Sequence, residues 1–220
     1  HRTLEKSPEI RELCPMVTEA TRYIGHVQIR TRGTIGGSVA HADPAAELPM
    51  VLRCLGGEIV LRSSSGERVV TPDEFFLTYL TTTIEPDEIL TEIRLPALSK
   101  QAGWSVKELA RRHGDFAIVA VATCLDLDEQ GRISNPRMAL AGVGGTPMYA
   151  SSTCDMLEGE QPSLQLLREA AEEVVKDIEP EADVHGSAEY RAEVSKVLAY
   201  RALREALGKI RPDLVQEEAS

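Results

Sequence analysis

Residues 30–47 read RTRGTIGGSVAHADPAAE, and the interpretation of the whole chain starts from this stretch. The consecutive glycines Gly36 and Gly37 let a backbone approach a ligand closely, and the hydroxyls of Thr34 and Ser38 add hydrogen-bond donors. The composition of residues 27–39 predicts a loop without regular structure. Asp43 followed by proline predicts an N-cap and a helix over residues 45–55. A loop of this kind before a helix suits a pyrophosphate, although most Gly-Gly pairs only make turns.

Short elements flank this stretch on both sides. In chain order, the patterns predict helices over residues 8–13 and 16–24, a β-hairpin over 58–62 and 67–70, a short helix or turn over 74–80 and a strand over 89–95. Residues 97–103 are the best candidate for a linker. We therefore expect a first domain over residues 1–98.

The second part of the chain changes from strands to helices. The patterns predict strands over residues 104–110, 117–127 and 137–143, and helices over 164–178 and 188–207, the last with Ser187 as N-cap and Val194, Val197, Leu198 and Leu203 as its apolar stripe. The predicted class is α+β. We expect a C-terminal domain over residues 103–209, with a three-stranded antiparallel sheet in 104–146, a helix bundle in 151–209 and a flexible tail at 210–220.

Composition narrows the classes of function. The chain has 220 residues, with 24 Lys and Arg against 35 Asp and Glu, so its net charge of -11 disfavours generic binding to nucleic acid. The four cysteines are scattered without a C-x-x-C pair, which predicts neither zinc nor an iron–sulfur cluster but four reduced, mostly buried thiols in a cytoplasmic protein. No apolar run is long enough to predict a membrane span.

Common catalytic motifs are missing from the sequence. There is no G-x-G-x-x-G after a strand, no Gly-Lys-Ser/Thr triplet and no G-x-S-x-G. We therefore assign no catalytic residue and no metal ligand.

A longer run of residues carries a family resemblance. Residues 24–49, IGHVQIRTRGTIGGSVAHADPAAELP, resemble the second flavin-binding motif of the medium, FAD-binding subunit of molybdenum hydroxylases, the carbon monoxide dehydrogenase and xanthine dehydrogenase family. The similarity continues through residues 75–76, 79–82, 85–90, 107, 111–112, 114–117, 140–144 and 188–191. It implies a PCMH-type FAD-binding lobe followed by a C-terminal flavoprotein domain.

The resemblance also implies a set of cofactor contacts. It places the FAD pyrophosphate on Thr34, Ile35, Gly36, Gly37 and Ser38. It places the ribityl and ribose side of the cofactor on Glu47, with Asp43 as a neighbouring candidate and His41 and Ala42 on the same wall. It implies that Leu90 covers the adenine or the ring system, that Lys107 reaches the pyrimidine edge of the isoalloxazine and that Tyr79 stacks on the ring.

The function implied by the resemblance is electron transfer. Substrate would be oxidised at a molybdenum cofactor on a large subunit, and electrons would pass through [2Fe–2S] clusters of a small subunit to this FAD and then to an acceptor, in a dimer of heterotrimers in the cytoplasm. The family also has an earlier Ala-Gly-Gly-x-Ser motif that residues 1–24 do not match, so we expect the N-terminal FAD-binding lobe to be lacking here. The alternatives are a self-contained flavin oxidoreductase and a flavin-free structural or assembly module of the same fold.

Overall fold

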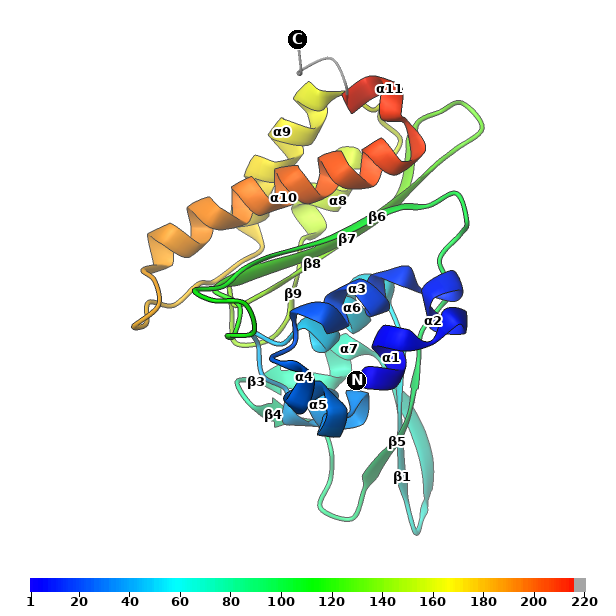
Figure 1. Cartoon of the computed structure of the whole chain (residues 1–220), viewed down its shortest axis with the longest axis vertical. Coiled ribbons are helices and arrows are strands. Elements are labelled where there is room, and N and C mark those ends of the chain that lie inside the picture. The colour runs from blue at the N-terminus through cyan, green and yellow to red at the C-terminus, as the bar shows by residue number, and fades with distance from the viewer. Residues whose placement is uncertain (216–220) are drawn as a thin grey trace.

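A four-stranded antiparallel sheet lies between two layers of helices in the computed structural model, which describes residues 1–215 (Figure 1). Its strands, in spatial order, are β6 (Gly103–Leu109), β7 (Val119–Leu127), β8 (Ile133–Ala141) and β9 (Met148–Tyr149). The mixed class agrees with the α+β prediction. The fourth strand is an addition to the three predicted, because a pair of residues is too short to show an alternating pattern.

The central strand β7 is buried on both faces, and its residues alternate between two cores. Val119 and Val121 pack with the C-terminal helices, whereas Ala120 and Ala122 pack with helices from the first part of the chain. This alternation follows from the two-residue period of a strand. Alanines on the second face let the helices lie close to the sheet, so the two halves of the chain share one apolar interface.

The C-terminal helices cover one face of this sheet. They are α8 (Ser151–Leu157), α9 (Leu164–Glu173) with the 3₁₀ helix η1 (Val174–Lys176), α10 (Ala188–Ile210) and α11 (Pro212–Val215). Ser187 caps α10 as predicted, because its side chain accepts a hydrogen bond from the Tyr190 amide. Leu198 and Leu203 of the predicted stripe are buried, but the prediction is wrong for Val197, which is exposed.

The predicted tail starts inside ordered structure. Helix α10 continues to Ile210, and Pro212 begins α11, which packs against α10. The remainder of the predicted tail, residues 216–220, lies outside the described residues.

The first part of the chain supplies the helices on the other face and two small sheets. Its helices are α1 (Arg2–Lys6), α2 (Pro8–Leu13), α3 (Pro15–Tyr23), α4 (Val27–Arg32), α5 (Ile35–His41), α6 (Glu47–Leu55) and α7 (Pro72–Phe75). One sheet has the order β2 (Gly66–Val70), β1 (Glu58–Ser63), β5 (Ile89–Arg94), and the other pairs β3 (Phe76–Thr78) with β4 (Thr81–Thr82). Helices α3 and α6 pack on the large sheet.

The prediction of a loop over residues 27–39 is wrong, because this segment forms α4 and α5. Thr34 makes a helix possible despite the glycines, since its hydroxyl accepts a hydrogen bond from the Gly37 amide at 3.0 Å and caps α5. Helix α6 also begins later than predicted, at Glu47. The Asp43 carboxylate accepts from the Ala45 amide at 2.8 Å, which makes a local turn before the helix instead of a helix cap.

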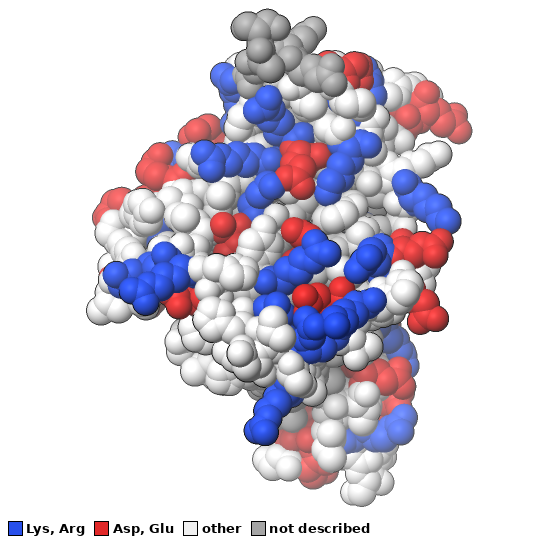
Figure 2. Space-filling model, in the orientation of Figure 1, with Lys and Arg blue, Asp and Glu red and all other residues white. Residues whose placement is uncertain are grey.

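The surface is mixed in charge. Figure 2 shows Lys and Arg side chains interspersed with Asp and Glu over the face seen in Figure 1. Within residues 1–215, no helix combines the length and the apolar character needed to cross a membrane.

Candidate functional site

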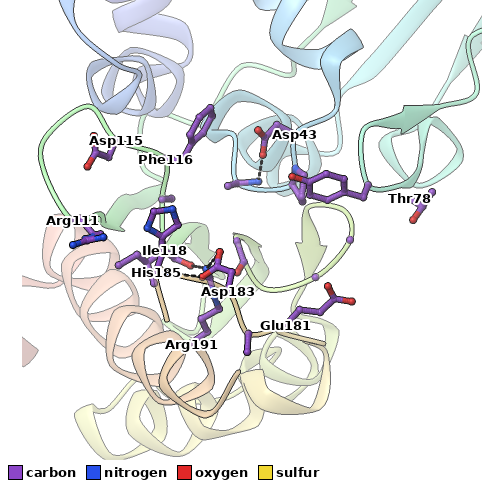
Figure 3. A pocket seen from close by; sticks show the side chains of 18 of the residues that line it. Asp43, Thr78, Arg111, Asp115, Phe116, Ile118, Glu181, Asp183, His185 and Arg191 are labelled. Carbon is purple, nitrogen blue, oxygen red and sulfur yellow. Dashed lines mark hydrogen bonds and ion pairs between the residues drawn. The ribbon is translucent and has the colours of Figure 1, made fainter. Parts of the chain in front are cut away.

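A cavity of about 830 Å³ lies where the two halves of the chain meet. Its walls from the first part are Asp43, Pro44, Ala45, Thr78 and Tyr79. Its walls from the second part are Arg111, Gly114, Asp115, Phe116, Ala117, Ile118, Gly142, Gly144, Gly145, Glu181, Ala182, Asp183, His185 and Arg191. Figure 3 shows Asp43 and Phe116 at one side of the open space, with Asp183 and Arg191 at the opposite side.

A buried arginine holds the floor of the cavity together. Arg191 on α10 donates hydrogen bonds to the carbonyl oxygens of Ile118 and Gly142, and to the Asp183 carboxylate at 2.7 Å. Desolvation acts against ionisation of Asp183, but the bonds from Arg191 and from two backbone amides hold the pKa of its carboxyl below the usual value. The guanidinium therefore joins the ends of β7 and β8 to the loop before α10.

Gly142 needs to be glycine at this floor. Its φ is +80°, a left-handed conformation, and a Cβ there would lie 2.5 Å from the Ile118 carbonyl oxygen. Its amide donates to the Pro44 carbonyl at 2.8 Å, which ties the second half of the chain to the wall formed by residues 43–45.

Two aromatic side chains at the cavity are strongly exposed. Tyr79 is 60% exposed and Phe116 is 72% exposed, although large aromatic side chains usually lie buried. Rings left open beside a cavity suit a planar ligand, which would cover them on binding. The sequence analysis named Tyr79 but missed Phe116, even though residues 114–117 (GDFA) belong to the run that carried the family resemblance.

The five predicted pyrophosphate residues lie together but outside this cavity. Thr34 is the N-cap of α5, and Ile35, Gly36, Gly37 and Ser38 form its first turns. Helix α5 packs against β5, and a Cβ added to Gly36 would lie 3.7 Å from Leu90 Cδ2, in ordinary contact. Leu90 therefore lies beside residues 34–38, which we call the glycine segment.

The remaining predicted residues of this segment connect α5 to the cavity. His41 is exposed at the end of α5, and Ala42 follows in a left-handed conformation, with φ of +54°. Asp43 then enters the cavity wall. The change of direction at Ala42 thus brings the end of the glycine segment to the cavity.

Glu47 begins α6 and is almost completely buried. Burial, together with the charge of Asp43, raises the pKa of its carboxyl to about 7. Glu108 on β6 lies near it, and burial, together with the charge of Glu47, raises the pKa of Glu108 to about 8. One oxygen of Glu108, Oε2, is buried without a hydrogen-bond partner. Glu108 therefore favours its protonated form at neutral pH, whereas the pKa of Glu47 places its titration close to neutral pH.

Lys107 does not line the cavity. It forms an ion pair with Glu205 of α10, because strand alternation turns it to the face opposite Val106, which lies in the interface core. Lys209 also pairs with Glu205, at 3.4 Å, and lies over the Trp104 ring. The charge of Lys107 is thus paired with a carboxylate of α10 and does not face the cavity.

An α+β fold with an aromatic-lined cavity between its halves defines a cofactor- or ligand-binding protein, and comparisons with known proteins specify the family. Residues 1–98 match the family model described as "FAD binding domain in molybdopterin dehydrogenase", and residues 104–206 match "CO dehydrogenase flavoprotein C-terminal domain". The "6-hydroxypseudooxynicotine dehydrogenase complex subunit alpha" of Paenarthrobacter nicotinovorans is 39% identical over 96% of this chain and 72% of its own length. The carbon monoxide dehydrogenase medium chain of Hydrogenophaga pseudoflava is 32% identical over 92% of this chain and 70% of its own length.

Solved structures agree with these sequence matches. Carbon monoxide dehydrogenase from Hydrogenophaga pseudoflava superposes with a TM-score of 0.90 at 32% identity, covering 94% of this chain and 72% of that chain. Quinoline 2-oxidoreductase from Pseudomonas putida 86 gives a TM-score of 0.88 at 32% identity, covering 96% and 73%. The chain belongs to the family of FAD-binding medium subunits of molybdenum hydroxylases, which are oxidoreductase subunits.

Proposed function

We propose that this chain binds FAD and transfers electrons in a molybdenum hydroxylase complex. The observation that carries the proposal is the cavity between the two halves, with Tyr79 and Phe116 open at its walls. An isoalloxazine is a planar ring system, and its faces would cover these aromatic side chains. When bound, FAD supplies a redox centre able to take up electrons and pass them to an acceptor.

The cavity has the features that a flavin ring requires. Gly144 and Gly145 line it and leave room for close approach of a ring to the backbone, and the Asp43 carboxylate in the cavity wall offers an acceptor. The Arg191 bonds keep the backbone of this floor in place. These residues hold and orient a ring, and none of them is assigned an acid–base step.

We assign the remainder of the cofactor to the segment from Thr34 to Glu47. The Gly37 amide is engaged by the Thr34 hydroxyl, but the amides of Ile35 and Gly36 in the first turn of α5 have no partner within the helix and can donate to phosphate oxygens. A protonated Glu47 can both donate to and accept from a hydroxyl, which suits the ribityl side. His41 and Ala42 form the wall between these contacts, and Leu90 lies beside Gly36 where it would cover an apolar ring face.

The proposal for the subunits of the complex rests on the family to which the chain belongs. We propose that a large subunit holds the molybdenum cofactor, that a small subunit holds the [2Fe–2S] clusters, and that two heterotrimers associate in the cytoplasm. All four cysteines of this chain are free and buried. Within residues 1–215, no group of three or more His, Cys, Asp or Glu side chains is placed to hold a metal ion.

The experiment is to purify the protein from its own cells with whatever subunits accompany it, then release and identify the cofactor. One FAD per copy of this chain, with molybdenum and iron in co-purifying subunits, is the expected result. Flavin without those subunits, together with substrate turnover, would instead indicate a self-contained oxidoreductase. A complex that releases no flavin would indicate a structural or assembly module.

A further inference from the structure

A second cavity, of about 350 Å³, lies at the C-terminal end of α6 and shares no lining residue with the larger cavity. Both halves of the chain form its walls, because Arg53 comes from α6, Arg137 from β8 and Tyr149 from β9, while residues 71–73 lead into α7. Figure 1 shows α6, α7 and β9 close together beside the large sheet. The fold thus brings two arginine side chains, far apart in the sequence, to one cavity.

Arg137 uses only part of its guanidinium for structure. Its Nη1 donates to the carbonyl oxygen of Leu55, the last residue of α6, at 2.9 Å. Its Nε is buried without a hydrogen-bond partner, and within residues 1–215 its Nη2 donates to no oxygen. Nε and Nη2 form the edge with which a guanidinium donates two parallel hydrogen bonds to a carboxylate or a phosphate. The bond to α6 therefore leaves this edge of Arg137 without an oxygen acceptor.

The charge of Arg137 is not balanced by a carboxylate of residues 1–215. Asp73 in the cavity wall is engaged, because it pairs with Nη2 of Arg53 at 2.6 Å. The other acidic residue of the wall, Glu58, pairs with Arg94 on the neighbouring strand, at 3.7 Å. A guanidinium stays protonated at any physiological pH, and a half-buried charge without a counter-ion favours binding of an anion.

Arg53 and Tyr149 add donors around the same space. Nη1 of Arg53 donates to the Pro147 carbonyl and its Nη2 binds Asp73, but its Nε is buried without a hydrogen-bond partner. Tyr149 contributes a phenol hydroxyl to the wall. A space of this volume admits an acetate or phosphate ion together with water.

We propose that this second cavity is a binding site for a small oxyanion, a carboxylate or a phosphate, held by the Nε–Nη2 edge of Arg137 with the positive charge of Arg53 beside it. The ion would accept two hydrogen bonds from Arg137 in the second half of the chain and face Arg53 in the first half. Because this arrangement exists only in the folded chain, bound oxyanion stabilises the folded state. The inference does not depend on flavin binding, since the two cavities share no lining residue.

The test is isothermal titration calorimetry with inorganic phosphate and, separately, with acetate, at an ionic strength held constant with sodium chloride. The protein is purified with its accompanying subunits and with its cofactor bound. We expect one ion to bind per copy of this chain and the melting temperature to rise with the concentration of that ion. Tighter binding of phosphate or of acetate identifies which oxyanion the site prefers. Lack of saturable binding of both ions up to about 10 mM would overturn the proposal.

Variants at position 137 show where the ion binds. Arg137→Met removes the charge and both donors, so saturable binding should be lost. Arg137→Lys keeps the charge but has no planar edge, so binding should weaken by about tenfold or more. Arg132→Met is the matched control, because Arg132 is exposed and directly precedes β8, and it should bind the ion like the wild-type protein.

The variants are compared through the change that the ion produces in each of them. Arg137→Met also loses the bond to the Leu55 carbonyl, so its melting temperature without oxyanion should be lower than that of the wild-type protein. The further rise on addition of phosphate or acetate reports binding alone. If Arg137→Met does not fold, Arg137→Lys provides the same test. Wild-type affinity in Arg137→Lys would place the ion elsewhere and would also overturn the proposal.

Discussion

Replacement of Arg191 by methionine tests whether one buried side chain holds the floor of the flavin cavity. Methionine retains much of the aliphatic volume but removes all of the guanidinium donors. The Ile118 and Gly142 carbonyls and the Asp183 carboxylate would each lose a hydrogen bond. The change therefore separates the polar contribution of Arg191 from its packing.

The loss of unfolding free energy in Arg191→Met depends on the groups that lose their hydrogen-bond partner, above all the Asp183 carboxylate. Breaking a buried ion pair by removal of one partner costs about 3–5 kcal/mol. We take the lower end, about 3 kcal/mol, because the Asp183 side chain is 46% exposed and water can replace part of its lost interaction. For a chain of this size that corresponds to a fall in melting temperature of roughly 6–12 °C.

The assay is thermal unfolding followed by circular dichroism, with Arg201→Met as the matched control. Arg201 lies on the same helix α10 and is exposed, so its replacement should change the melting temperature by no more than about 2 °C. We expect flavin affinity to fall in Arg191→Met as well, because the floor loses its fixed backbone. A melting temperature equal to that of Arg201→Met would show that the guanidinium of Arg191 does not stabilise the cavity floor.

Three further predictions concern the cavity and its surroundings. Phe116→Ala should weaken FAD binding by about tenfold through loss of ring stacking. Flavin fluorescence in an equilibrium titration measures the affinity, and an unchanged affinity would rule out Phe116 as a ring contact. In chemical unfolding, Gly142→Ala should destabilise the protein far more than Gly131→Ala. Both glycines have a positive φ, but only at position 142 would a Cβ lie 2.5 Å from a carbonyl oxygen. Equal destabilisation by the two substitutions would contradict the prediction. Glu108→Gln should raise stability at alkaline pH and change it little at pH 5. The reason is that folding raises the pKa of Glu108 from 4.5 to about 8, so the free energy of unfolding of the wild-type protein falls as the pH rises from about 4.5 toward 8. The glutamine of the variant cannot ionise and avoids this loss. Parallel stability–pH curves for the two proteins would argue against this explanation.

The elements with strong periodic patterns could be predicted from the sequence. The helix that follows Ser187 has both a side-chain cap and an apolar stripe, and strand β7 is apolar at most of its positions because helices cover both of its faces. The segment around Gly36 and Gly37 could not, because residue preferences disfavour a helix there and the cap from Thr34 acts only once the chain is folded.

The candidate site depended on contacts that no local pattern contains. Residues 43–45 meet Phe116 and Gly142 only through the packing of α3 and α6 on the sheet, so the cavity has no continuous sequence signature. Lys107 illustrates the converse, since its place in the strand turns it toward Glu205 and away from the cavity.

Binding of the flavin ring in the cavity can be tested directly by tryptophan fluorescence of a Phe116→Trp variant, purified with its partner subunits, with and without bound FAD. We expect FAD to quench nearly all of the emission added by this tryptophan, because the ring would lie in contact with residue 116. If FAD binds and the added emission persists, the flavin ring lies elsewhere and the assignment of the cavity is contradicted.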